Sequence, residues 1–105
     1  MRSITTAFAA LCVLSVADSA AAAVSDMDYL RANRCRGLAA GELAAVDTVA
    51  MDAFLKAAKR SRASHVVDRG RTEMEKAKSE AKTQNEERRA RLTAELTGPC
   101  QVYKG

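Results

Sequence analysis

The pattern of apolar and polar residues predicts two long helices, over 42–62 and 72–97. The first carries an apolar stripe at Leu43, Val46, Ala50 and Phe54. Spacings of three and four residues are those of one helix face. The second consists mostly of strong helix formers, contains no Gly or Pro, and ends at the helix-stopping pair Gly98-Pro99. No strand-like alternation or hairpin dipeptide occurs, so we expect an all-α fold.

A short helix is predicted before these two, over 26–35. Ser25 can supply an N-cap oxygen, and two aspartates follow it in the first turn. We expect Gly37 and Gly41 to break or bend the chain after this helix.

The second long helix is unusually polar. Between positions 68 and 91, Met74 is the only large apolar side chain and fourteen residues are charged. Such a segment is either a solvated helix supported by pairs such as Glu87 with Arg91 or a disordered stretch. Its Glu, Lys, Arg, Ala and Gln content favours the helix.

The N-terminal segment is typical of a secretory signal peptide. An apolar run over 4–17 is followed by small residues that suit cleavage between Ala23 and Val24. The run is too short to cross a bilayer, because a membrane helix needs about 20 apolar residues. We therefore expect a signal peptide over 1–23, one small domain over 24–105, a periplasmic or secreted protein, and no transmembrane span.

Two of the three cysteines remain after this cleavage, Cys35 and Cys100. An even number in a short exported chain predicts one disulfide, and two free thiols are the alternative. Closing a loop of 65 residues would stabilise the fold by roughly 4 kcal/mol on the chain-entropy model. Neighbouring arginines are interpreted as a helix-end charge group beside this bond: Arg31, Arg34 and Arg36.

The midpoint between the two cysteines falls in the expected turn over 61–70. The two long helices would then pair as an antiparallel helical hairpin closed by the disulfide, with Ala81 opposite Phe54. The mature chain has eighteen large apolar residues, which is few even for a small domain. We therefore expect a second copy or another protein to cover the apolar stripe.

Little in the chain suggests catalysis. His65, the only histidine, lies in the expected turn without a nucleophile or an orienting partner. Asp47 and Asp52 are five positions apart and so occupy different helix faces. No metal-ligand spacing, phosphate loop or haem motif occurs, so we expect no enzyme, no metal and no cofactor.

Basic residues gather around the expected turn. The formal net charge is +4, and five cations form what we call the basic tip: Lys59, Arg60, Arg62, Arg69 and Arg71. The tip is either a contact for an anionic envelope surface or a solvated turn. Nucleic-acid binding is not expected, because the tip lacks aromatic residues and no DNA-binding motif matches.

Two functions fit these features. The first is a non-enzymatic interaction or scaffold protein of the cell envelope. The second is a periplasmic stress chaperone or holdase. In its size, expected compartment and single cysteine pair the chain resembles the acid-stress chaperones of the bacterial periplasm, although no motif carries that resemblance.

Overall fold

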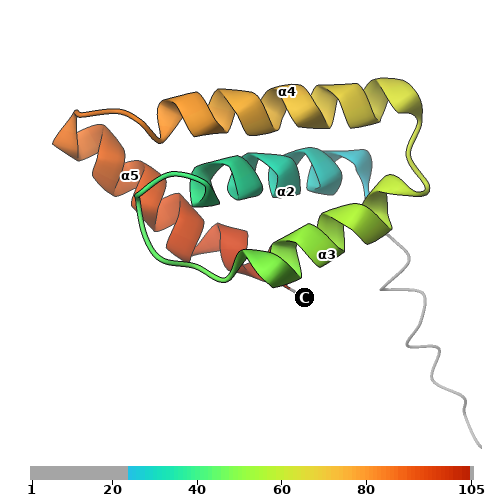
Figure 1. Cartoon of the computed structure of the whole chain (residues 1–105), viewed down its shortest axis with the longest axis horizontal. Helices are drawn as coiled ribbons and strands as arrows, with labels where there is room; N and C mark the ends of the chain where they lie inside the picture. Colours follow the sequence, from blue (N-terminus) through green and yellow to red (C-terminus); the bar gives the residue numbers. More distant parts are fainter. Residues whose placement is uncertain (1–23, 105) are drawn as a thin grey trace, which may run out of the picture.

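Helix α2 (Asp26–Ala39) runs through the centre of the molecule, with α4 on one side and α3, α5 and η1 on the other (Figure 1). The structure is a computed structural model that describes residues 24–104. The remaining elements are α3 (Thr48–Lys59), α4 (Ser64–Glu80), α5 (Glu86–Thr97) and the 3-10 helix η1 (Pro99–Lys104). The described part contains no strand, which confirms the all-α prediction. The predicted signal peptide lies outside the described residues.

Among the four α-helices within residues 24–104, three begin with a side-chain cap. Ser25, Asp47 and Asn85 each accept a hydrogen bond from a backbone N–H of the first turn, at 2.9–3.0 Å. These bonds satisfy N–H groups that have no partner within the helix. The N-cap role predicted for Ser25 is confirmed. Helix α4 follows Ala63, which has no side-chain cap.

Glycines bring α2 and α4 into close contact. A Cβ added at Gly37 would lie 2.8 Å from the Cβ of Ala77, and one at Gly41 would lie 2.7 Å from the Cβ of Ala81. On α4, a Cβ added at Gly70 would lie 2.6 Å from Nδ2 of Asn33 and 2.8 Å from Cε1 of Tyr29, both on α2. The residue numbers of these contacts rise together along both helices, so α2 and α4 run parallel (Figure 1).

The prediction that the first helix ends near position 35 is wrong. Helix α2 continues through Gly37 to Ala39. A glycine costs a helix roughly 0.5–1 kcal/mol relative to alanine. Here the missing side chain permits the contact with α4, and packing outweighs the local preference. Small buried residues on several sides of α2, rather than one apolar stripe, explain why its extent is hard to predict.

The single helix predicted over 72–97 is two helices in the structure. Thr83 Oγ1 accepts the backbone N–H of Asn85 at 3.2 Å, and Asn85 in turn caps α5. These side-chain hydrogen bonds compete with helix continuation. The break turns α5 so that Leu92 and Leu96 are buried in the core beside α2.

The expected hairpin of 42–62 with 72–97 is not the arrangement found, because α2 lies between α3 and α4 (Figure 1). The first segment begins its helix only at Thr48. Ala81 packs in the main core, whereas Phe54 contacts the ring of Tyr103 with centroids 5.4 Å apart. The small residues of α2 approach the polar α4 more closely than the bulkier stripe of α3 could.

Two apolar clusters form the interior of the part of the chain that the structure describes. The larger joins α2 to α5 and η1 and consists of Cys35, Leu38, Met51, Ala77, Ala81, Leu92, Leu96 and Cys100. The smaller consists of Tyr29, Ala58 and Val66. The predicted disulfide is confirmed: Cys35 and Cys100 are bonded, with Cα atoms 5.5 Å apart and both residues buried.

Removing the disulfide should lower stability strongly. It connects the central helix to the C-terminal segment across 65 residues, so Cys35→Ala with Cys100→Ala should reduce the free energy of unfolding by about 3–4 kcal/mol. Denaturant unfolding measures this change. Peptide mapping of the exported protein without reductant should find the two cysteine peptides joined. Separate, alkylatable peptides would contradict the bond.

Gly37→Ala should also destabilise the protein, because its methyl group would overlap α4. A loss of about 1–3 kcal/mol is expected from overpacking. Ser79→Ala at an exposed position of α4 is the control and should change stability by less than about 0.5 kcal/mol. If Gly37→Ala instead raised the melting temperature, as a simple gain in helix propensity predicts, the close α2–α4 contact would be wrong.

Candidate functional site

A hollow of about 350 Å³ lies over α2 between α3 and α4, and we call it the basic groove. Its volume is at the lower end of the range of about 300–1,000 Å³ found for ligand pockets. It is open to solvent and is lined by Tyr29, Asn33, Asp52, Leu55, Lys56, Lys59, Val67, Arg71 and Met74. Because α2 separates the two flanking helices (Figure 1), residues from three elements meet here.

The floor of the basic groove depends on the contact between α2 and α4. Tyr29 and Asn33 are each 4% exposed, and a Cβ on Gly70 would overlap both. Asn33 Nδ2 donates to the carbonyl oxygen of Tyr29 at 2.9 Å, so this buried amide has a partner. The half-buried apolar side chains of the groove are Leu55, Val67 and Met74. The floor is therefore packed and largely apolar.

The rim of the basic groove is positively charged. Lys56 and Lys59 from α3 and Arg71 from α4 are all exposed. Within residues 24–104, neither lysine has an ion-pair partner, and Arg71 makes only a 3.7 Å contact to an exposed carboxylate of its own helix. The groove's carboxylate, Asp52, is paired with Arg36 at 2.6 Å. The rim thus offers three cations to an incoming anion.

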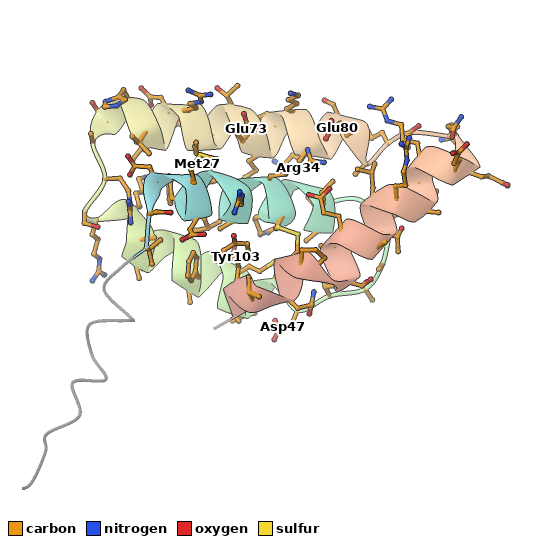
Figure 2. The ribbon with its side chains drawn as sticks, turned by 180° about the vertical axis from the view of Figure 1, so that it is seen from behind. Met27, Arg34, Asp47, Glu73, Glu80 and Tyr103 are labelled. Carbon is orange, nitrogen blue, oxygen red and sulfur yellow. A yellow bond between two sulfur atoms is a disulfide. The ribbon has the colours of Figure 1, made fainter. Side chains whose placement is uncertain are left out.

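The residues of the predicted basic tip do not share one surface. Lys59 and Arg71 line the basic groove, whereas Arg69 lines a separate hollow of about 190 Å³ between α2 and α4. Met27 and Glu73, labelled in Figure 2, belong to that second hollow. Positions two apart on a helix point about 200° apart, so one flat surface cannot include both arginines of α4.

Arg62 is a packing residue of the fold. Its side chain is only 9% exposed, and it donates to Asp26 at 2.7 Å and to the carbonyl oxygen of Val24. Its guanidinium carbon lies 5.9 Å from the centroid of the Tyr29 ring, a cation–π distance. These contacts attach the start of α2 to the end of α3, so Arg62 is not available as a surface contact, unlike the exposed Arg60.

Arg34 joins three helices through two carboxylates, and we call Arg34, Glu80 and Glu95 the Arg34 cluster. The guanidinium donates to both oxygens of Glu95 on α5, at 2.7 and 2.9 Å, and to Glu80 on α4. Figure 2 shows Arg34 and Glu80 between their two helices. Hydrogen bonding to Glu95 raises the pKa of Arg34 above its ordinary value. Partial burial of the side chain lowers this pKa, but by less than the carboxylates raise it. The partners lie 46 and 61 positions away, so no local sequence signal points to them.

A third hollow, of about 670 Å³, lies beside the disulfide. Its lining mixes both charge signs, because Asp28, Arg31, Arg34 and Glu95 all lie around it together with Tyr103. Burial raises the pKa of the Tyr103 hydroxyl, and the nearby charge of Asp28 adds to that rise. Tyr103 is therefore neutral at physiological pH. Balanced charge gives this hollow no clear preference for one ligand class.

The predicted partner stripe is partly covered by the chain itself. Leu43 and Val46 pack against the larger core, and Phe54 packs against the smaller core and Tyr103. All four stripe residues, including Ala50, are half-buried. Association through the stripe stays a prediction, but it would cover less apolar area than the sequence pattern suggests.

The described residues bring together no nucleophile, base and orienting group. His65 is exposed in the first turn of α4, and the carboxylates of Asp47 and Asp52 are used in a helix cap and an ion pair. Over residues 24–104, no group of three His, Cys, Asp or Glu side chains is placed to bind a metal. No helix in this part of the chain is long and apolar enough to cross a membrane.

Comparisons with protein-family models, curated proteins and solved structures find no match to this chain. The functional proposals below therefore rest on its own residues and geometry.

Replacing Arg34 should weaken the attachment of α5. Arg34→Gln should lower the free energy of unfolding by about 2 kcal/mol. A single hydrogen bond to a charged group contributes roughly 1.5–3 kcal/mol, and the three bonds of this partly exposed cluster contribute less than their sum because solvent screens them. Arg34→Lys should lose less, since it keeps the charge but not the two-pronged contact. Chemical denaturation compares both with Arg91→Gln, an exposed α5 control. Equal stability of the Arg34→Gln and Arg91→Gln proteins would contradict a structural role for the Arg34 cluster.

Proposed function

We propose that this protein is a non-enzymatic interaction protein of the cell envelope, exported after removal of residues 1–23, and that it binds an anionic partner in the basic groove. The observation that carries the proposal is the exposed positive rim over a largely apolar floor. Lys56, Lys59 and Arg71 converge there from two helices, and neither lysine has an ion-pair partner within residues 24–104.

The disulfide supports an extracytoplasmic location, because such bonds persist in the periplasm and outside cells. It lies in the core and secures the C-terminal segment, which suits a small domain that must remain folded without a partner. A periplasmic or secreted scaffold is the localisation and role that we propose.

The holdase alternative has less support in the folded state. A holdase needs exposed apolar surface, and the large apolar residues that are most exposed lie on three different elements: Met27, Val49 and Val102. We expect a holdase to unfold in part before it binds a client, because this would expose a larger apolar surface. The preformed basic groove needs no such step.

Binding to anionic probes tests the proposal. The exported protein should bind vesicles containing phosphatidylglycerol, soluble polyglutamate, or both. Binding should weaken as salt rises, because the Debye length falls from about 10 Å at ~0.1 M to about 3 Å at ~1 M. The triple variant Lys56→Gln, Lys59→Gln, Arg71→Gln should lose this binding.

The matched control removes three exposed charges outside the basic groove: Arg60→Gln, Arg69→Gln and Lys76→Gln. It has the same net charge as the groove variant and should retain binding. Equal losses in the two variants would show that only net charge matters, and salt-independent or absent binding to both probes would reject the proposed function.

A further inference from the structure

We infer that the basic groove accepts an acidic amphipathic helix from a partner protein; this inference rests on the function proposed above. The groove is bounded by two helices that both pack on α2. A helix placed in it would contact α2, α3 and α4 together. That arrangement completes a four-helix bundle around the groove, a stable way to bury an amphipathic helix face.

The apolar floor of the basic groove can pack against the apolar face of such a helix. Leu55 from α3 and Val67 and Met74 from α4 are half-buried and apolar. An incoming helix would place apolar residues at i, i+3, i+4 and i+7 against them. Methionine adapts its shape to different apolar partners, which suits a docking surface.

Charges flank this apolar floor from opposite sides. Lys56 and Lys59 come from α3, and Arg71 comes from α4. Acidic residues on both edges of the partner's apolar face could therefore pair with cations at the same time. Complementary charge of this kind sets orientation and excludes basic partners.

Other occupants fit less well. A second copy of this chain carries the same +4 net charge and would meet a rim of the same sign. A flat membrane would not reach a concave floor, and the tip arginines Arg69 and Arg71 line different hollows. A free acyl chain needs a site that encloses most of its surface, whereas the groove is open to solvent.

A synthetic peptide tests the inference. The probe is a helix-forming peptide with leucines at i, i+3, i+4 and i+7 and glutamates along both edges of that face. Its control is a scrambled peptide of identical composition. Fluorescence anisotropy with the exported protein should show at least tenfold tighter binding of the amphipathic peptide, and circular dichroism should show added helix on binding.

Variants locate the contact. Losing three rim pairs should weaken peptide binding about tenfold, because exposed pairs contribute roughly 0.2–1 kcal/mol each and about 1.4 kcal/mol is tenfold. The variant is Lys56→Gln, Lys59→Gln, Arg71→Gln, and the charge-matched control outside the groove should bind as wild type does. Val67→Thr keeps the shape of the floor but adds a hydroxyl. It should weaken binding of the amphipathic peptide and leave polyglutamate binding unchanged, with unfolding curves verifying that each variant is folded.

The outcomes separate this inference from the proposed function. If the scrambled peptide, polyglutamate or vesicles bind through the groove as tightly as the amphipathic peptide, the helical partner is rejected and the anionic contact stands. If sedimentation shows that the protein alone dimerises through the groove, the inference is likewise overturned. If the wild-type protein binds neither the peptides, polyglutamate nor vesicles through the groove, both proposals are rejected.

Discussion

The close contact between α2 and α4 determines the arrangement of the other helices. Gly37 on α2, Gly41 in the turn after α2 and Gly70 on α4 have no side chain where the two segments meet. Side chains there would force the helices apart, because protein interiors are packed too densely to absorb extra methyl groups without strain. Because one side of α2 is covered by α4, α3 and α5 pack on the remaining surface of α2. The polar α4 gains a buried face made of small residues such as Ala77, although Met74 is the only large apolar side chain in its C-terminal half.

The C-terminal third of the chain is attached to this pair by two different interactions. The disulfide connects η1 to α2, and the Arg34 cluster connects α5 to both α2 and α4. Between them, Leu92 and Leu96 complete the larger core. A chain with so few large apolar residues gains much of its stability from such cross-links, because burial alone offsets little more than the conformational entropy lost on folding.

The basic groove follows from the same arrangement. Because α2 separates α3 from α4, these two helices cannot cover one another's inner edges, and the apolar residues between them remain half-buried. Cations from both helices face a common space, whereas Arg62 and Arg36 are used in ion pairs with Asp26 and Asp52. A surface that combines exposed cations with an apolar floor suits the recognition role that we propose.

The sequence by itself determined the helical class, the N-cap at Ser25 and the pairing of Cys35 with Cys100, because these depend on local composition, capping chemistry and the presence of two cysteines after position 23. It also identified two of the three cations on the rim of the basic groove, Lys59 and Arg71, but it did not predict the packed floor beneath them. Only the tertiary structure decided that α2 is central, that 72–97 is interrupted, and which carboxylates Arg34 binds. The physical reason is that glycine and alanine packing carries no apolar periodicity, and that ion pairs across 46 and 61 positions depend on which helices meet. Such contacts form through the fold as a whole, and local sequence patterns do not encode them.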